Sequence, residues 1–448
     1  MNRRAAVVVG VVLGVLYTLS PLSMVAIPAG VLAVWWSSRD MGADERRWFY
    51  WIVGIAMALR LMAVAGLFLS AGADRPFVTF FGDEELFKSR PVWIRNIGLG
   101  VPISPADYIY AYDDTGKSGY LFVLAAVQAF FGETPYAIHV LNAVTYLAGT
   151  LLLHRLARTR FDRVAAMIGL GVLLFMPSLF AWSISALKEP MYTLVAAAEV
   201  LIVIAIVRAP RPWQKVLAIA ALVVSALVLE SLRKGGLQVA AAGAIGGIAA
   251  GLIVPRPRLL LASAIAAPIA LVLLLNVAPV QARVLTVVRD SVRYHAGHVL
   301  TPGQTYQLVD PDYYFDWPAI FKIGPAEGAQ YVSRAIIHYF VEPLPWIERS
   351  RATLAYVPEQ AFWWTLVLLT PFGLAAGLKR DALVTSTLMA HAVAIVIMVS
   401  LTSGNIGTLI RHRGLVLPYI VWIAALGGCA LLYSFTRHSR VGEADDIR

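Results

Sequence analysis

Long apolar runs recur along the chain and are separated by short polar segments. Ten of these runs predict membrane-spanning helices, because about 20 apolar residues cross a ~30 Å hydrocarbon core. They cover approximately residues 48–70, 137–154, 163–182, 187–208, 213–230, 237–254, 258–280, 361–378, 382–401 and 415–436. The pattern therefore predicts an all-α polytopic membrane protein, in which each helix satisfies its own backbone.

Two further apolar stretches leave the number of crossings open. Residues 5–36 would form a helix of about 48 Å, which is long for one untilted crossing, and Ser20-Pro21 could divide it into a hairpin. Residues 119–131 are short enough to lie at the membrane interface instead of crossing it. Counting these stretches, we expect roughly 11–13 transmembrane helices.

Composition excludes an ordinary soluble enzyme, since 59% of the residues are hydrophobic and only 14% are charged. The net charge of +10 does not indicate nucleic-acid binding, because basic residues of such proteins mostly orient loops. The single cysteine, Cys429, excludes an internal disulfide and a cysteine-ligated metal cluster. Arginine-rich loops and Ala/Val/Gly-rich spans are typical of a GC-rich bacterium, so we expect a multi-pass protein of the bacterial cytoplasmic (inner) membrane.

The basic loops predict which side of the membrane each connection faces. Arginines and lysines gather around residues 39–47, 155–163, 208–215, 256–258, 379–380 and 437–440, which the positive-inside rule places in the cytoplasm. Residues 71–118, 183–189, 231–236, 281–360 and 402–414 then face outward. This divides the chain into a transmembrane module over residues 1–280, a large outer loop over 281–360, and C-terminal helices with a short cytoplasmic tail over 361–448.

Three consecutive carboxylates, Asp83, Glu84 and Glu85, lie in the first outer loop. Such a group can supply a general base or an oxygen-rich site for a divalent metal such as Mg or Mn, although it could also be a solvated acidic patch. The preceding span contains Arg60, whose charge needs a partner inside the membrane; Glu199 of a later span is one candidate.

Cations stand in several of the other outer loops, where they could bind phosphate. Lys188 and Glu189 precede Pro190 at a helix start, whose free N–H groups favour anions. Arg233 lies in the 231–236 loop, and Arg411 and Arg413 follow two glycines near residue 404, an arrangement suited to a bidentate grip on phosphate. Helix capping, loop orientation and headgroup contacts are the alternative interpretations.

The 281–360 segment combines aromatic, acidic and basic residues and could bind an acceptor or act as a lid. Arg293 and Tyr294 are its candidate substrate contacts, since aromatic rings stack on sugar faces, but aromatic residues also form ordinary interfacial belts. His295 and His298 could bind a metal if helical, although no third ligand is obvious.

The motifs of residues 48–210 resemble those of the GT-C superfamily of lipid-linked-sugar glycosyltransferases. Leu59-Arg60-Leu61 in the first of these spans precedes Gly82-Asp83-Glu84; Lys117-Ser118-Gly119-Tyr120 and Phe130-Phe131-Gly132 follow; then come His154-Arg155-Leu156-Ala157-Arg158 and Leu187-Lys188-Glu189-Pro190. The pattern is similar to that of bacterial protein-mannosyltransferase-like and aminoarabinose-transferase-like members. Where those members carry His/Lys-Pro-Pro, this chain has Lys117-Ser118-Gly119.

The resemblance implies a GT-C-like fold with a site built by the extracytoplasmic loops. It implies transfer of a sugar from a polyprenyl-phosphate donor to a glycan, lipid or protein acceptor, with inversion. By position, Asp83 would be the base, with Glu84 next to it. We expect Lys117, Lys188, Arg233, Arg411 and Arg413 to bind the donor phosphate, and Glu85, Glu189, Arg293 and Tyr294 to contact substrate.

Two other functions stay open. A polysaccharide polymerase or O-antigen-ligase-like transferase would depend on basic residues of the late loops. A flippase or transporter of lipid-linked glycans would instead show polar clusters near the midplane and repeated halves. Neither a cofactor nor a metal follows directly from the sequence, and membrane lipids are the other expected partners.

Overall fold

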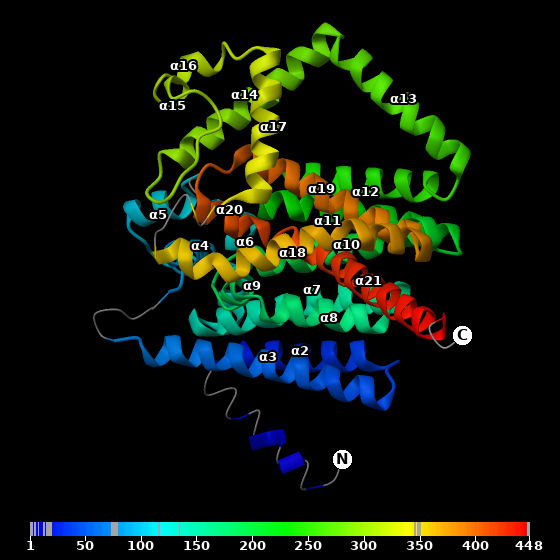
Figure 1. Cartoon of the computed structure of the whole chain (residues 1–448). Coiled ribbons are helices and arrows are strands. Elements are labelled where there is room, and N and C mark those ends of the chain that lie inside the picture. Colours follow the sequence, from blue (N-terminus) through cyan, green and yellow to red (C-terminus); the bar gives the residue numbers. More distant parts are fainter. Residues whose placement is uncertain are drawn as a thin grey trace. The chain divides into compact units, whose positions relative to one another are not determined.

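A computed structural model of the chain describes residues 20–72, 79–114, 117–133, 135–344, 346 and 351–445, with a few positions before Ser20 (Figure 1). These residues form helices and no strand. They divide into two compact units. Unit 1 comprises Met1–Arg158, Met167–Ile202 and Val216–Leu237, and unit 2 comprises Thr159–Ala166, Val203–Lys215 and Gln238–Arg448.

The described part of the chain contains nine helices that are long and apolar enough to span a membrane, or ten if one bent pair is a single span. These helices are α3 (Ala43–Leu69), α7 (Pro135–Arg160), α10 (Glu189–Arg208), α11 (Pro212–Leu232), α12 (Gly236–Ile253), α13 (Pro257–Leu275), α18 (Arg351–Arg380), α19 (Ala382–Thr402) and α21 (Leu417–Asp445). The bent pair is α8 (Arg163–Phe175) and α9 (Pro177–Ser183), which meet at 64°. Each of the ten predicted spans corresponds to one of these, which confirms the polytopic helical class.

The two ambiguous stretches form short helices. Residues 119–131 are α6 (Gly119–Phe131), whose 13 residues reach only about 20 Å. Within the 5–36 stretch, α2 (Ser23–Ser38) has 16 residues, and most of the preceding positions lie outside the described residues. The expected total of 11–13 crossings is therefore not reached by the described helices.

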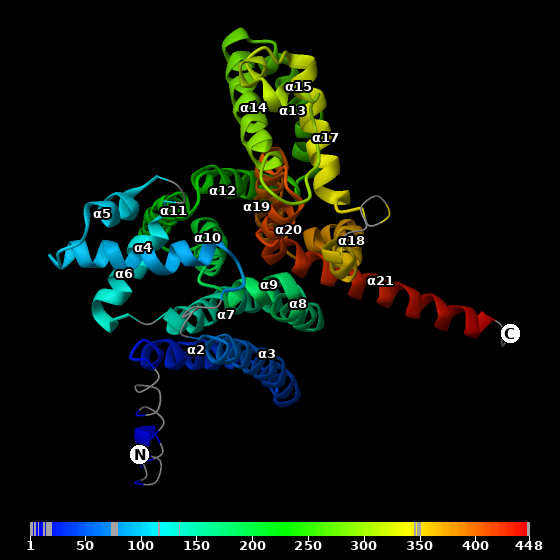
Figure 2. The same ribbon diagram turned by 90° about the vertical axis from the view of Figure 1, so that its left-hand side faces the viewer.

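In unit 1, α2 and α3 lie beside α7, as Figures 1 and 2 show. Small residues allow α7 to approach its other neighbour closely. A Cβ atom placed on Gly149 would lie 2.9 Å from the Cα of Leu194 in α10. Close backbone approach of this kind is typical of helix packing in membranes, where van der Waals contact drives association.

Glycines have the same role in unit 2. A Cβ on Gly373 of α18 would lie 1.7 Å from the carbonyl oxygen of Ile423 in α21, so these two helices touch backbone to backbone. On α12, Gly247 and Gly251 face the backbone of α19 at Thr387 and Leu383. Any larger residue at these glycines would force the helices apart.

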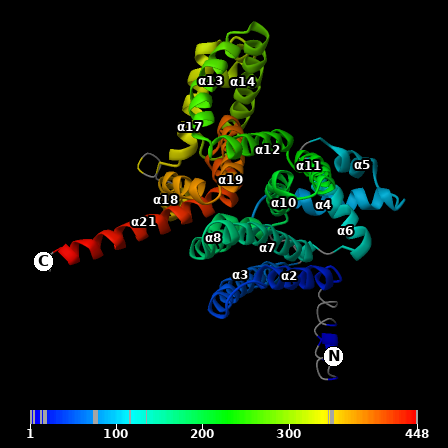
Figure 3. The same ribbon diagram turned by 90° about the vertical axis from the view of Figure 1, so that its right-hand side faces the viewer.

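The predicted 281–360 loop is largely helical. It contains α14 (Ala278–Val299), α15 (Asp312–Phe315), α16 (Trp317–Ile320) and α17 (Pro325–Val341), and α14 and α17 lie side by side (Figures 2 and 3). This region supplies partners to the C-terminal carbonyls of α19, which a helix cannot satisfy itself. Tyr331 donates to Leu401 O, His298 to Thr402 O at 2.7 Å, and Tyr306 to Ser403 O at 2.7 Å.

Ion pairs join loops that the positive-inside rule places on one side. In unit 1, Arg155 and Arg158 near the end of α7 bind Asp40 at 2.7 Å and Glu45 at 2.5 Å, close to the turn between α2 and α3. In unit 2, Asp381 lies 2.6 Å from Arg208 and 3.9 Å from Arg160. The loops joined in each unit belong to the predicted cytoplasmic set, so these contacts agree with that grouping.

The topology can be checked with single cysteines in a Cys429→Ser background. Lys234→Cys in unit 1 and Thr301→Cys in unit 2 should react with a membrane-impermeant maleimide in intact cells, because both exposed positions lie in predicted outer loops. Asp44→Cys and Thr159→Cys, which are equally exposed, should react only after permeabilisation. Labelling of an outer and an inner position under the same condition would contradict the predicted orientation.

Candidate active site

The connection between α9 and α10, residues 184–188, is irregular and almost entirely buried within unit 1. Irregular backbone cannot satisfy its own N–H and C=O groups, and burial removes water as a substitute partner. Side chains from other helices must therefore supply those hydrogen bonds.

Polar side chains of α7 bind the carbonyls of this connection. The side-chain amide of Asn142 donates to Ser185 O at 2.6 Å and to Leu187 O at 2.8 Å. The hydroxyl of Tyr120 in α6 donates to Asn142 Oδ1 at 3.0 Å, which fixes the orientation of the amide. One turn earlier on the same face, His139 Nδ1 lies 2.5 Å from Ile184 O and donates to it.

The carboxylate of Glu84 holds the same connection from a third helix, α4 (Asp83–Gly98). Glu84 Oε2 accepts the N–H of Ala186 at 2.9 Å, and Oε1 accepts those of Phe80 and Phe81 at 2.8 and 2.9 Å. Both oxygens are thus engaged with backbone amides, and the residue is fully buried. This geometry gives Glu84 a positioning role.

Asp83 has a different environment from Glu84. It is the first residue of α4 and is exposed, near the positive end of the helix dipole. Because Glu84 binds Ala186, the segment that also carries the preceding residue, Asp83, is hydrogen-bonded to the connection that carries Lys188. Lys188 is half-buried and stands directly before α10. The structure thus places a predicted base and a predicted phosphate-binding cation on two hydrogen-bonded segments.

The other predicted residues of unit 1 have different environments. Glu189 is buried, and it lies close enough to Tyr120 for its charge, like that of Glu84, to affect the pKa of the Tyr120 hydroxyl. Burial raises the pKa of Tyr120, against the hydrogen bond to Asn142, and the two carboxylates raise it further. The charge of Arg233 acts on Tyr192, one turn into α10 from Lys188. Glu85 and Lys117 are exposed, and Lys117 lies 3.3 Å from Asp114.

Lys88 is a buried cation that no sequence motif indicated. It lies one turn after Glu84 on α4, with its ammonium 5.4 Å from the centroid of the Tyr136 ring. Burial lowers the pKa of Lys88, while the charge of Glu84 opposes that shift. His139, Asn142 and Tyr120 were missed too; polar residues three apart within an apolar span were the available signal.

Arg60 does not form the ion pair with Glu199 that we considered from the sequence. Its Nε donates to Ser183 Oγ at 2.8 Å and its Nη1 to Ala56 O at 3.1 Å. The guanidinium also lies 4.9 Å from the centroid of the Phe180 ring. Arg60 therefore supports α9 next to the 184–188 connection, and aromatic faces stabilise its charge.

Arg411 and Arg413 lie in unit 2 on α20 (Ile406–Arg413), two residues apart and in different environments. Arg413 is buried: Nε donates to Tyr339 O at 2.9 Å and Nη1 to Gln360 Oε1 at 2.8 Å, and Nη2 also donates to Tyr339 O. Burial lowers the pKa of Arg413. Arg411 is half-buried at the surface of the helix. Arg413 thus joins α17 to α18, whereas Arg411 keeps the accessibility that a ligand would need.

The predicted residues of α14 fall into two groups. Arg293 and Tyr294 are exposed, with the guanidinium of Arg293 6.0 Å from the centroid of the Trp317 ring. His295 is buried, and its Nδ1 donates to Ser403 O at 2.6 Å. Burial lowers the pKa of His295 to about 4, so the ring is neutral at pH 7. Since His295 and His298 both use Nδ1 for carbonyls, the two rings serve as caps of α19. Among the described residues no group of three metal-ligating side chains occurs.

Replacing Glu84 by Gln should destabilise the protein, whereas the same change at the neighbouring Glu85 should not. The amide of Gln would place an N–H against a backbone N–H and lose charge-assisted bonds, at a cost of about 2–4 kcal/mol. Thermal unfolding in detergent should show a clearly lower melting temperature for Glu84→Gln and little change for the exposed Glu85→Gln. Equal melting temperatures of the two variants would contradict the positioning role.

Arg413→Lys should also lower stability, because one ammonium cannot reach both Tyr339 O and Gln360 Oε1 in the guanidinium geometry. We expect a loss of about 2–3 kcal/mol, since buried acceptors lose a charged donor. Arg47→Lys, at an exposed arginine, is the control and should unfold like the parent chain. A tolerated Arg413→Lys would show that its contacts contribute little.

Comparison with known proteins found no match: no protein-family model, no curated protein and no solved structure matches this chain. The resemblance to the GT-C superfamily therefore stays an expectation drawn from the sequence motifs.

Proposed function

We propose that the chain is a membrane glycosyltransferase that moves a sugar from a polyprenyl-phosphate donor to an acceptor on the extracytoplasmic face. The observation that carries this proposal is the hydrogen bond between Glu84 and the N–H of Ala186. It joins the segment that bears the exposed Asp83 to the segment that bears Lys188. A base and a cation in one neighbourhood are what this transfer requires.

In the proposed reaction, Asp83 removes the proton of an acceptor hydroxyl while the hydroxyl oxygen attacks the anomeric carbon of the donor sugar. The bond between that carbon and the phosphate oxygen breaks, and the phosphate leaves with the electron pair. Lys188 and the positive end of the α10 helix dipole stabilise its charge. Attack opposite the leaving group inverts the anomeric centre.

The assignments within the site follow burial. Glu84 and Asn142 hold the 184–188 connection and do not contact substrate. Arg233, near the start of α10, adds a second positive charge for the phosphate. Arg411, Arg293 and Tyr294 belong to unit 2, and their contacts to substrate stay predictions from the sequence. The buried Arg413 joins α17 to α18.

A flippase or transporter of lipid-linked glycans is the second candidate. It is favoured by the bend of 64° between α8 and α9, since interrupted helices surround transport sites in many transporters. The buried charges of Arg60 and Glu199 inside candidate spans point in the same direction. This function requires no base at residue 83.

Asp83→Asn should abolish transfer without unfolding the protein, because the amide keeps the shape of the carboxylate but cannot accept the proton. Mass spectrometry of lipid-linked and acceptor glycans, in a strain lacking the chain and complemented with each variant, should show at least a 100-fold loss of product. Asp107→Asn, at a half-buried carboxylate of the same predicted loop, is the control and should restore the product.

Two outcomes would contradict the proposal. Normal product with a well-expressed Asp83→Asn variant, together with loss in Arg293→Ala, would favour the polymerase-like alternative. The transporter would be favoured if variants of Arg60 kept normal sugar transfer but lost transbilayer movement of the lipid-linked glycan in reconstituted vesicles.

A further inference from the structure

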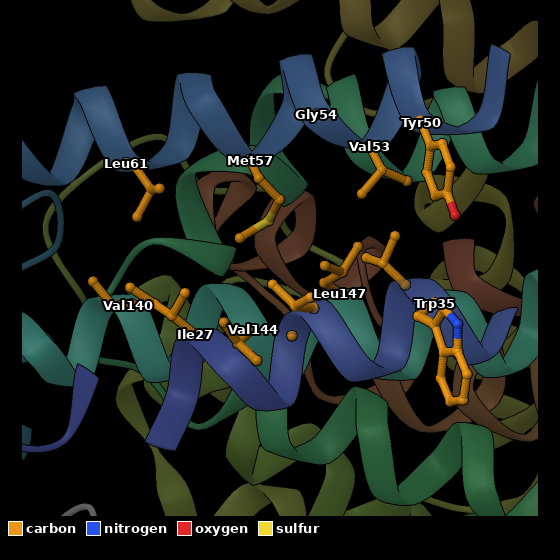
Figure 4. A pocket seen from close by; sticks show the side chains of 13 residues that line it. Ile27, Trp35, Tyr50, Val53, Gly54, Met57, Leu61, Val140, Val144 and Leu147 are labelled. Carbon is orange, nitrogen blue, oxygen red and sulfur yellow. The ribbon is translucent and has the colours of Figure 1, made fainter. Parts of the chain in front are cut away.

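An apolar groove lies within unit 1 between α2, α3 and α7. Its volume is about 510 Å³, within the range of sites that hold a drug-sized or larger apolar ligand. Figure 4 shows α3 along one side of the groove, with α2 and α7 along the other. The lining side chains are aliphatic or aromatic and include Ile27, Val53, Met57, Val144 and Leu147.

The groove is continuous with the outer surface of this helix layer. Val31, Trp35 and Leu61 line it and are also well exposed, so the groove is open towards the surroundings of the protein. In a bilayer, such a surface meets acyl chains. Because lipid tails are as apolar as leucine, filling the groove depends on close dispersion contacts. A concave channel of this size gives a chain more such contacts than a flat helix face.

The two ends of the groove differ in chemistry. Leu61 and Val140 lie at one end, whereas Trp35 and Tyr50 lie together at the other (Figure 4). The Tyr50 hydroxyl is 2.9 Å from Ser38 Oγ, at the end of α2. Aromatic residues with one polar edge are typical of the membrane–water interface. The Trp35–Tyr50 end is therefore the end at which a lipid headgroup would sit.

A cation is placed over this end. The guanidinium carbon of Arg39 lies 3.8 Å from the centroid of the Trp35 ring, and Arg39 is exposed. No ion pair of Arg39 occurs among the described residues.

The charges around this end are unbalanced. Five arginines gather there against three carboxylates: Arg39, Arg46, Arg47, Arg155 and Arg158, with Asp40, Asp44 and Glu45. Asp40 and Glu45 bind Arg155 and Arg158, and Arg46 donates to Met41 O at 2.9 Å. The surplus is positive, which favours an anionic headgroup.

We propose that this groove binds one acyl chain of an anionic phospholipid, whose phosphate lies on Arg39. The lipid belongs to the leaflet next to the turn between α2 and α3. It is distinct from the proposed sugar donor, whose phosphate would lie near Lys188. Arg39 precedes the first residue of α3, whereas Glu84 comes after its last residue. The 27 residues of this helix span about 40 Å, which separates its two ends.

The test uses glycine substitutions that fill space without disturbing the helix. Gly54 lines the groove, and a Cβ there would meet nothing within 4 Å, so Gly54→Phe should place its ring in the groove. Gly66→Phe is the matched control, because Gly66 is on the same helix, has equally open space and does not line the groove. The full-length variants are reconstituted in bilayers of equal parts phosphatidylglycerol and phosphatidylcholine, re-extracted in mild detergent and analysed by native mass spectrometry.

We expect the parent chain and Gly66→Phe to retain one phospholipid per chain, enriched in phosphatidylglycerol, and Gly54→Phe to lose it. Arg39→Ala should reduce the preference for phosphatidylglycerol by about five-fold, whereas Arg47→Ala, which removes the same charge away from Trp35, should change it less. Equal retention by the two glycine variants, or equal effects of the two arginine variants, would overturn the proposal. Retention of added polyprenyl phosphate in place of phospholipid would overturn it too. The catalytic role of Asp83 predicts none of these results, so failure of one proposal does not imply failure of the other.

Discussion

Five residues of irregular backbone, 184–188, must be satisfied inside a protein that offers them almost no water, and unit 1 is organised around that requirement. Glu84, His139 and Asn142 come from two helices far apart in sequence, and each binds a peptide group of this connection. A buried peptide group left without a partner costs about 1–3 kcal/mol, so the bonds are not optional. Because the partners are fixed, the start of α4 and the start of α10 are fixed against one another.

Unit 2 meets the same requirement at a helix end. The last carbonyls of α19 are bound by Tyr331, His298, His295 and Tyr306, all from the 281–344 region. The buried Arg413 extends this pattern, since two of its three nitrogens bind one backbone carbonyl. In both units, ionisable side chains act mainly as partners of backbone groups. Glu84, a candidate for catalysis, and Arg413, a candidate for phosphate binding, both bind backbone groups in this way.

The spans could be predicted from the sequence because hydropathy alone determines which segments can enter a membrane. The division of roles between Asp83 and Glu84 could not. Neighbouring residues on a helix point about 100° apart, so only one of three consecutive acids faces the protein, and the direction depends on where α4 packs. Arg411 and Arg413 differ for the same reason. The resemblance pointed to Lys188. It did not point to His139 and Asn142 of α7, which bind the 184–188 connection through tertiary contacts that periodicity does not reveal.

The position of Arg60 has a consequence for how the chain is made. Its hydrogen-bond partner Ser183 follows 123 residues later. At a synthesis rate of about 5–20 residues per second, Arg60 has been made for about 6–25 s before that hydroxyl exists. During this interval the apolar remainder of α3 alone must keep an arginine in the bilayer, which costs about 2.5 kcal/mol or more at the centre of a helix. The leucines and isoleucines around Arg60 thus serve biogenesis as well as the finished fold. Replacing them with polar residues would first reduce the fraction of chains in which α3 inserts into the membrane.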